Sequence, residues 1–484
     1  MSWLVIGSCA RELAILKKLK KDNSNIKLYC VGSNHNPETL SIVENFSIIS
    51  NLNNLLKFCK LHSIKYAVIG PEKYLGIGMV DLLESQNIKC IGPSERLARI
   101  ETNKFYAREL LEKNGSAPYN PIYKHFTSLD TPEKIKDYYE FCKELDFKYV
   151  IKSTRLCSGK GVKVSGVHFK NDLEGLMYTL ELLNKKHSVL IEEKLEGDEF
   201  TLMSYSDGTY FSHMPVVTDF KQLEKEDSPN TGSMGSISYS NHRAPFLTES
   251  DIVLAREINC KTVEFLNKDN KELYKGIIYG SYIKCYSGEI KIIEFNSRYG
   301  DPECINVLEL LETSLYDIYE GIILDKLVFV TPIYSSMNII SKYLVPNFYP
   351  EKNESIYQIE PNWYKENKSN IILSSVNKYE NLILSTSSRT LVYFEKGDDL
   401  NLISQKINSN LDISNSDIRN GIGLQSEEDN SCLGGCVSID KAQNIVESMS
   451  PFIKNTFNNN CFHSIGDYSG IIGIPKQYKE PVFI

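Results

Sequence analysis

The sequence predicts a protein of several domains that mixes α/β and α+β architecture and begins with an open parallel α/β sheet. The chain has 484 residues, which is enough for roughly three to four domains of about 100–200 residues each. Its first part alternates short apolar runs with helix-like segments, a pattern typical of a parallel sheet with crossover helices. From about Pro121 the pattern changes to strand, glycine-rich loop and strand.

Composition indicates a globular protein and argues against two classes of partner. Apolar residues make up 42% and charged residues 24% of the chain, as in proteins with hydrophobic cores. The net charge is −8 and no dense Lys/Arg cluster occurs, so no nucleic acid is expected as a partner. No apolar run reaches the roughly 18 residues of a membrane span, and the N-terminus lacks signal-peptide features. We expect a cytoplasmic protein with no membrane contact and with its twelve cysteines reduced.

The first predicted strand leads into a tight turn of small residues. Trp3-Leu4-Val5-Ile6-Gly7 is apolar, and Ser8-Cys9-Ala10-Arg11-Glu12 opens a helix-like stretch that runs to Lys21. A strand, a tight turn and a helix N-terminus together expose backbone N–H groups that bind phosphate. Because the dinucleotide fingerprint G-x-G-x-x-G is absent, a dinucleotide is not indicated.

Two more strands are predicted in this unit, at residues 26–31 and 65–70, with helices between them. Gly70-Pro71-Glu72 closes the second of these strands at its carboxyl end, where open parallel sheets bind ligands. A purely structural turn is the alternative interpretation of this tripeptide. A helix from Thr102 to Gly115 is expected to complete the unit, with Gly115 as its C-cap.

The next motifs point toward phosphate chemistry. Tyr149-Val150-Ile151-Lys152 is an apolar strand that would bury a lysine, which is unfavourable without an anion nearby. The loop Cys157-Ser158-Gly159-Lys160-Gly161-Val162 follows. Its glycines would let the backbone approach phosphates, and its lysine adds positive charge. A simple hairpin loop is the alternative, because the spacing and the helix of a Walker loop are missing.

The most informative stretch contains Glu294, Asn296 and Arg298. It continues a β-branched run that follows a Ser287-Gly288 turn, so it is predicted to be a strand. Residues two apart in a strand share a face, so Glu294 and Asn296 would present a carboxylate and an amide oxygen together. Hard oxygen ligands suit the Mg²⁺ that nucleotide phosphates carry. Arg298 would continue this face and bind a carboxylate or phosphate.

The strand is expected to end at Gly300-Asp301-Pro302, a turn that opens a helix near Glu303. Taken alone, the whole stretch could also be a polar edge strand followed by a turn. The remaining motifs favour the metal-binding interpretation.

One of these motifs is Val189–Thr201, where a strand runs into Glu192-Glu193-Lys194-Leu195 and Gly197-Asp198-Glu199. It resembles the adenine-binding linker of the ATP-grasp superfamily. The resemblance implies that Glu192 and the backbone around Leu195 meet adenine and that Glu199 meets ribose. Lys104 and Lys152 lie at the positions where the superfamily has its two lysines that bind nucleotide phosphates. The ATP-binding residues implied in this way are Lys104, Lys152, Gly159, Lys160, Gly161, Glu192, Glu193, Leu195 and Glu199.

Three motifs narrow the resemblance to phosphoribosylamine–glycine ligases, also called glycinamide ribonucleotide synthetases. They are Ile69–Glu72, Pro229–Gly235 and Glu294–Glu303, and the likeness extends over about residues 1–425. It implies an ATP-grasp domain with a lid and a small β-rich C-terminal domain. The expected limits are 1–120 for the N-terminal substrate-binding α/β domain, 121–196 for the lid, 197–330 for the catalytic core and 331–425 for the C-terminal domain.

Such ligases join glycine to 5-phosphoribosylamine in purine biosynthesis, converting ATP to ADP and phosphate through glycyl phosphate. By resemblance, Glu294 and Asn296 hold Mg²⁺ or Mn²⁺, and the catalytic residues are Arg298, Asp219 and Lys221. Arg298 and Asp219 would hold the carboxylate and the ammonium group of glycine. The residues implied to bind substrate are Gly7, Ser8, Arg11, Glu12, Gly70, Pro71, Glu72, Asn230, Thr231, Gly232, Met234, Gly235, Gly300 and Asp301.

Two other functions are alternatives. A related ATP-grasp ligase could use another acid or amine, differing at residues 9–13 and 219–222, where this sequence departs from the family pattern. A non-catalytic nucleotide-binding scaffold of the purine pathway is the other alternative. Association with other purine-pathway enzymes and formation of a homodimer are both left open.

Residues 426–484 are expected to form a linker and an incomplete domain. Gly435–Asp440, Ile445–Glu447 and Tyr478–Val482 resemble the amino-terminal start of aminoimidazole ribonucleotide synthetase. About 50 residues are too few to build a second active site. The alternative is a tail that caps the ligase or supports dimerisation.

Overall fold

The computed structural model describes residues 1–49, 51–157, 161–221, 223, 231–351, 356–411 and 413–424. The chain divides into two compact units, residues 1–424 and 425–484. The second unit lies outside the described residues, so the expected start of a second synthetase domain stays a prediction. None of the described helices combines the length and apolar character needed to cross a lipid bilayer. The nine cysteines in the described part are all free thiols.

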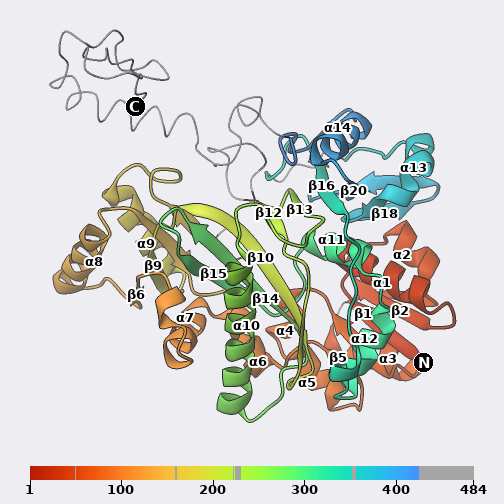
Figure 1. The fold of residues 1–484 in the computed structure, drawn as a ribbon, viewed down its shortest axis with the longest axis horizontal. Helices are drawn as coiled ribbons and strands as arrows, with labels where there is room; N and C mark the ends of the chain where they lie inside the picture. Colours follow the sequence, from red (N-terminus) through yellow and green to blue (C-terminus); the bar gives the residue numbers. More distant parts are fainter. Residues whose placement is uncertain are drawn as a thin grey trace, which may run out of the picture. The chain divides into compact units, whose positions relative to one another are not determined.

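The N-terminal sheet is open and parallel, as predicted (Figure 1). Its strands, in spatial order, are β3 (Asn45–Ile48), β2 (Lys27–Gly32), β1 (Ser2–Ile6), β4 (Tyr66–Ile69) and β5 (Lys89–Ile91). Alternate residues of β1 enter two different cores, Trp3 and Val5 one of them and Leu4 and Ile6 the other. The strand is therefore apolar throughout, as a strand buried on both faces must be.

The helices of this part follow the strands in crossover order. They are α1 (Ala10–Asp22), α2 (Pro37–Ile42), α3 (Leu52–Leu61), α4 (Glu72–Leu75), α5 (Met79–Glu84), α6 (Glu95–Thr102) and α7 (Lys104–Lys113). The expectation of one helix running on from Thr102 is wrong. Asn103 is extended, and its Oδ1 accepts a hydrogen bond from Tyr106 N at 3.1 Å, so it caps a new helix. Gly115 follows that helix with φ +83°.

The lid is a separate antiparallel sheet with its own core. Its spatial order is β6 (Tyr123–Phe126), β9 (Val189–Glu193), β7 (Tyr149–Ser153) and β8 (Val162–Val164). The helices α8 (Pro132–Glu144) and α9 (Asp172–Asn184) belong to the same core through residues such as Tyr138 and Leu176.

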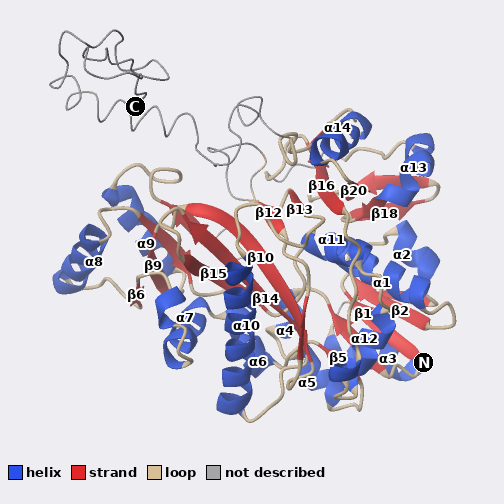
Figure 2. Ribbon diagram, viewed as in Figure 1, coloured by secondary structure: helices blue, strands red, loops and turns tan. Residues whose placement is uncertain are grey.

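The central sheet contains the strand that the sequence singled out. Its order is β11 (Phe211–His213), β10 (Gly197–Ser206), β14 (Gly276–Cys285) and β15 (Ile290–Asn296). The long helix α10 (Glu249–Asn270) runs along this sheet (Figure 2) and buries Ala255 and Ile258. β15 ends at Asn296, earlier than expected, so Arg298 lies after the strand and not on it. The chain then turns at Gly300–Pro302 and enters α11 (Glu303–Leu310), as predicted, and then α12 (Leu315–Ile323).

A fourth sheet crosses the expected limit between catalytic core and C-terminal domain. Its strands are β12 (Thr218–Phe220), β13 (Gly235–Ser238), β16 (Asn338–Pro346), β20 (Leu391–Gly397) and β17 (Ile371–Leu373), with β21 (Ser416–Asp417) paired to β16. The remaining elements are β18 (Val376–Tyr379), β19 (Leu382–Ser385), α13 (Pro361–Asn367), α14 (Leu400–Asn410), η1 (Ala117–Tyr119), η2 (Leu327–Phe329) and η3 (Lys368–Asn370). The proposed domain limits stay predictions.

Gly276 joins the N-terminal and central sheets at close range. It begins β14 with φ +138°, and a Cβ added there would lie 2.9 Å from Gly92 N. We expect Gly276→Ala to lower the free energy of unfolding by roughly 2–4 kcal/mol through backbone strain plus steric overlap. Gly288→Ala is the control, because its φ is +96° but no atom lies within 4 Å. Equal losses of stability in denaturant titrations of the two variants would contradict this account.

Candidate active site

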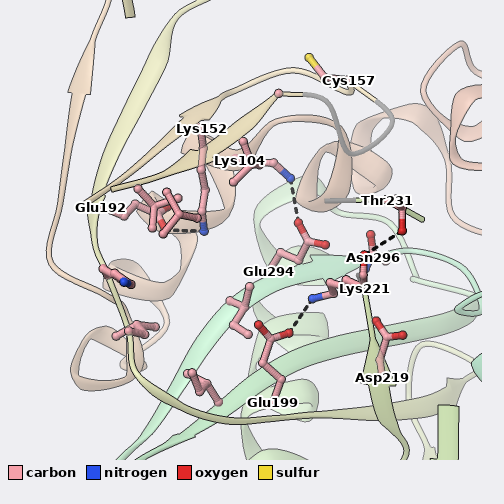
Figure 3. Close-up of a pocket in the computed structure, with 18 of the residues that line it drawn as sticks. Lys104, Lys152, Cys157, Glu192, Glu199, Asp219, Lys221, Thr231, Glu294 and Asn296 are labelled. Carbon is pink, nitrogen blue, oxygen red and sulfur yellow. Dashed lines mark hydrogen bonds and ion pairs between the residues drawn. The ribbon is translucent and has the colours of Figure 1, made fainter. Parts of the chain in front are cut away.

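A cleft of about 640 Å³ lies between the lid sheet and the central sheet (Figure 3). Side chains from both sheets, from α7 and from β12 line it. The predicted residues that line it are Glu72, Lys104, Lys152, Gly161, Glu192, Glu193, Leu195, Glu199, Asp219, Lys221, Thr231, Glu294, Asn296 and Arg298. Residues from six separate stretches of sequence therefore converge on one cavity.

Arg108 is a buried side chain that connects the lid sheet to the central sheet behind the cleft. Its Nε and Nη2 donate to the two carboxylate oxygens of Glu192 at 2.8 and 2.9 Å. The same guanidinium donates to the carbonyls of Ile292 at 3.0 Å and Ile293 at 2.7 Å, on β15. One side chain on α7 thus ties lid strand β9 to the strand that carries Glu294.

Glu192 also holds Lys152, whose Nζ lies 2.7 Å from Glu192 Oε2. Although burial acts to raise it, Arg108 and Lys152 lower the pKa of Glu192 to about 2. Burial lowers the pKa of Lys152, while Glu192 acts in the opposite direction. The sequence argument that Lys152 needs an anion is correct, and the protein supplies one.

Lys104 and Glu294 face each other across the cleft floor, 2.9 Å apart. Burial would raise the pKa of Glu294, but Lys104 and Lys221 outweigh it and hold this pKa well below its usual range. Lys221 lies 2.7 Å from Glu199 Oε2. Lysines and carboxylates therefore alternate along the floor, a charge pattern suited to a phosphate chain with a bound cation.

Glu294 and Asn296 lie two residues apart in β15, opposite Ser281 and Tyr279 of β14. They therefore share a face, as predicted. Within the described ranges no three His, Cys, Asp or Glu side chains gather as metal ligands. One carboxylate and one amide oxygen fit a divalent ion that takes its other ligands from phosphates and water.

Arg298 sits between two acidic side chains of the N-terminal part. Its Nη2 lies 3.1 Å from Glu101 Oε1 and its Nε 3.5 Å from Glu72 Oε2. Glu101 is 4% exposed and its other oxygen accepts from the backbone N and the Oγ of Ser297 at 2.8 and 2.9 Å. Burial raises the pKa of Glu101, with Arg298 opposing that shift.

Asp219 lies on β12 and lines the cleft near Lys221, which directly follows that strand. Burial and the nearby Glu303 raise the pKa of Asp219 to about 7, against the opposing effect of Lys221. Ser233 donates a hydrogen bond to Asp219 Oδ1. The carboxyl group therefore titrates near neutral pH in this environment.

The predicted residues of the first turn form a neighbouring cluster. Arg11 Nε donates to Glu12 Oε1 at 2.7 Å, and Arg11 Nη1 donates to the carbonyl of Tyr299 at 3.0 Å. The Glu12 side chain fills the space beside Gly7 and Gly70, where an added Cβ would lie 2.6 and 2.1 Å from its atoms. The two glycines are thus needed to admit this carboxylate.

Asp301 belongs to a third cluster, on the C-terminal side. Arg389 Nη2 lies 2.8 Å from Asp301 Oδ2, and Tyr343 donates to Asp301 Oδ1 at 2.5 Å. Arg389 Nη1 also donates to the carbonyl of Ser233 at 2.7 Å. Arg389 therefore fastens the turn after β15 to the segment before β13.

Several predicted residues do not line the cleft. Met234 is fully buried, its N donates to the carbonyl of Phe220 and its carbonyl accepts from Tyr343 N. Among the described residues, the others outside the lining are Gly7, Ser8, Arg11, Glu12, Gly70, Pro71, Gly232, Gly235, Gly300 and Asp301. Gly159, Lys160 and Asn230 lie outside the described residues.

Sequence reasoning missed Arg108, Glu101, Arg389 and Arg419, which build or line the site. Arg108 carried a usable signal, since it follows Lys104 by four residues and so shares its helix face. The others lie far in sequence from their partners, so no local pattern reveals them.

The fold and the cleft define an ATP-grasp enzyme, and ATP-grasp ligases use ATP with a divalent metal ion. Residues 1–101 match the phosphoribosylglycinamide synthetase N domain, and residues 102–304 match the ATP-grasp (A) domain of that synthetase. The chain belongs to the phosphoribosylamine–glycine ligase family, a family of carbon–nitrogen ligases.

Sequence relatives support this assignment over most of the chain. The phosphoribosylamine–glycine ligases of Methanothermobacter thermautotrophicus and Methanocorpusculum labreanum are 36% and 39% identical to it, and each alignment covers 83% of this chain and 90% of the relative. Crystal structures show the same fold. The phosphoribosylamine–glycine ligase of Thermotoga maritima has a TM-score of 0.67 at 23% identity, covering 87% of this chain and 100% of that one. Biotin carboxylase from Campylobacter jejuni has a TM-score of 0.63 at 16% identity, covering 95% of this chain and 97% of that one.

We expect Arg108→Met to lower the free energy of unfolding by about 3–5 kcal/mol, because it leaves a buried carboxylate with one partner fewer. Denaturant unfolding measures this loss. Lys185→Ala is the control, since it removes an exposed pair with Glu181 that is worth less than about 1 kcal/mol. A loss for Arg108→Met no larger than the control would show that Arg108 does not stabilise the junction.

Proposed function

We propose that this chain ligates glycine to 5-phosphoribosylamine, yielding glycinamide ribonucleotide, ADP and phosphate, in de novo purine biosynthesis. Family membership supports the activity, because relatives that carry this name align over 90% of their length. The observation that carries the proposal is the cleft floor, where Glu294 and Asn296 share a face next to Lys104 and Lys221. A cytoplasmic location, association with other pathway enzymes and a homodimer remain predictions.

For ATP, we assign the phosphates to the lysine side of the cleft. Lys104 and Lys152 are held by Glu294 and Glu192, so their ammonium groups are pre-positioned for anions. Both oxygens of Glu192 are already engaged by Arg108 and Lys152, which leaves adenine recognition to the backbone near Leu195. Glu199 is proposed for the ribose hydroxyls.

Glu294 and Asn296 are the residues we propose for Mg²⁺ or Mn²⁺. When bound, such an ion supplies charge neutralisation and orientation of the phosphate oxygens. The Lys104 ammonium now pairs with Glu294, so binding of the metal nucleotide would transfer part of that lysine's interaction to phosphate.

The chain's own residues would position glycine and the amine. A glycine carboxylate oxygen attacks the γ-phosphorus, the bond to the β-phosphate oxygen breaks, and ADP leaves. The amine of phosphoribosylamine then attacks the acyl carbon, phosphate leaves and the amine releases a proton. Arg298 would orient the glycine carboxylate and Asp219 its ammonium group. No side-chain nucleophile is needed, so exclusion of water from the acyl phosphate is the main task of the lid.

For phosphoribosylamine, we propose the segments around Gly7–Glu12, Gly70–Glu72 and Thr231–Gly235. Glu72 and Thr231 line the cleft, and Glu12 links the first two segments. The substrate would thus approach from the N-terminal part, opposite the lid.

The first test is ADP release with Mg-ATP, glycine and phosphoribosylamine formed in the assay. We expect turnover to require both substrates, and Glu294→Ala to reduce it by roughly a hundredfold or more, because several kcal/mol of charge stabilisation is lost. Glu289→Ala is the control, an exposed glutamate just before the same strand.

Other outcomes identify the alternatives. Nucleotide binding without turnover would favour a scaffold. ADP release with another acid in place of glycine would indicate a related ligase with a different substrate. Full activity in Glu294→Ala would remove Glu294 from the metal site.

Asp219 should make glycine binding depend on pH. With a pKa of about 7, its carboxylate forms only as pH rises, so the KM for glycine should fall about tenfold between about pH 6 and 8. Asp219→Asn should abolish this dependence and raise KM. A pH profile of KM that is the same in both proteins would contradict the role.

The same shift predicts a stability effect with the opposite sign. Because the folded pKa lies above the unfolded value, the folded state keeps a proton that the unfolded state has lost between about pH 4 and 7. Asp219 therefore makes stability fall as pH rises through that window. Thermal unfolding of Asp219→Asn should lack this contribution.

A further inference from the structure

The C-terminal part of the unit contributes an arginine to the cleft. Among the described residues that line the cavity, Arg419 alone comes from beyond residue 330. It follows β21, and its guanidinium lies 5.2 Å from the ring centroid of Phe220. Phe220 is the last residue of β12, directly after Asp219 and before Lys221. Arg419 therefore borders the part of the cleft that we assign to glycine and phosphoribosylamine.

The turn that carries Arg419 is fixed by a buried lysine. Lys342, in the middle of β16, is 0% exposed. Its Nζ donates to Ser404 Oγ at 2.7 Å, to Asn408 Oδ1 at 2.7 Å and to the carbonyl of Asn420 at 2.9 Å. An ammonium group has three donors, and neutral oxygens use all of them. The bond to Asn420 holds the residue directly after Arg419.

Further contacts fix the same turn from both sides. Asn408 Nδ2 donates to the carbonyl of Asn420 at 3.1 Å, and Ser404 Oγ donates to the carbonyl of Ile422 at 2.6 Å. Ile422 packs so closely on Gly235 that an added Cβ would lie 2.7 Å from its Cδ1. Gly235 pairs with Phe220 in the β12–β13 ladder. The turn is thereby attached to the segment proposed for phosphoribosylamine.

We propose that Arg419 binds the phosphate group of phosphoribosylamine and that Lys342 positions it. This inference rests on the function proposed above. Lys104 and Lys152, paired with Glu294 and Glu192, lie on the side of the cleft that we assign to the nucleotide. Arg419 lies beside Phe220, which pairs with Gly235 in the β12–β13 ladder. A guanidinium presents paired N–H donors that match phosphate oxygens.

Ribose 5-phosphate is the probe, because it carries the phosphate and lacks the reactive amine. Calorimetry on the full chain should show about ten- to hundredfold weaker binding in Arg419→Gln, the range expected for loss of a charge-assisted hydrogen bond. The affinity of Arg419→Lys for ribose 5-phosphate should be intermediate, since lysine keeps the positive charge but lacks the paired N–H donors of the guanidinium. The affinity for Mg-ADP should stay within about twofold of wild type, as expected for a residue that touches only the other substrate.

Arg96→Gln is the matched control, because it makes the same chemical change at an exposed position of α6. In steady state, Arg419→Gln should raise the KM for phosphoribosylamine more than the KM for glycine. Unchanged affinity for ribose 5-phosphate in Arg419→Gln, or no binding by wild type, would overturn the proposal. A selective loss of Mg-ADP affinity would assign Arg419 to the nucleotide instead. Wild-type binding of ribose 5-phosphate without ligase turnover would contradict the proposed function but leave the phosphate site standing.

Lys342→Met tests the positioning role. It should weaken ribose 5-phosphate binding as Arg419→Gln does, while Mg-ADP binding is kept. Should this variant fail to fold, Asn408→Ala removes one acceptor of Lys342 and one donor to Asn420 and should give a smaller loss of the same kind. A lower melting temperature with unchanged ribose 5-phosphate affinity would mean that these residues act on stability alone.

Discussion

The geometry of the site depends on the buried guanidinium of Arg108, whose N–H groups all need hydrogen-bond partners. Arg108 is only 3% exposed, and a charge so removed from water is tolerated only with good hydrogen-bonding partners. Its partners are Glu192 on the lid strand and the carbonyls of Ile292 and Ile293 on β15. Because all these bonds must form together, lid strand β9 and strand β15, which carries the candidate metal ligands, keep a fixed spacing.

The same constraint recurs at the other junctions of the unit. Arg298 links β15 to the N-terminal part through Glu72 and Glu101, and Arg389 links the following turn to the C-terminal part through Asp301. Each arginine joins carboxylates or carbonyls from separate elements. The elements around the cleft are therefore connected by ion pairs and charged hydrogen bonds. A change in one of these charges would alter both the spacing of the elements and the electrostatic field in the cleft.

Lys342 is a buried cation whose hydrogen-bond partners are neutral groups and not carboxylates. Its ammonium group has hydroxyl, amide and carbonyl oxygens as its hydrogen-bond partners, and burial lowers its pKa to about 7. This arrangement orders three chain segments at once, because β16, α14 and the turn at Asn420 all take part in it. It explains how a turn near residue 420 can hold a side chain in a cavity built mostly from residues before 300.

Local patterns in the sequence determined the parallel N-terminal sheet, the strand that presents Glu294 and Asn296 on one face, and the turn before Glu303. These features follow from alternation, turn chemistry and residue type within a few positions. The break at Asn103 is equally local, but residue type alone does not distinguish an asparagine that caps a new helix from one inside a continuous helix. Only the tertiary structure decided which charges pair. Arg108 meets Glu192 across 84 positions and Lys104 meets Glu294 across 190, and such pairs form only after packing brings their elements together.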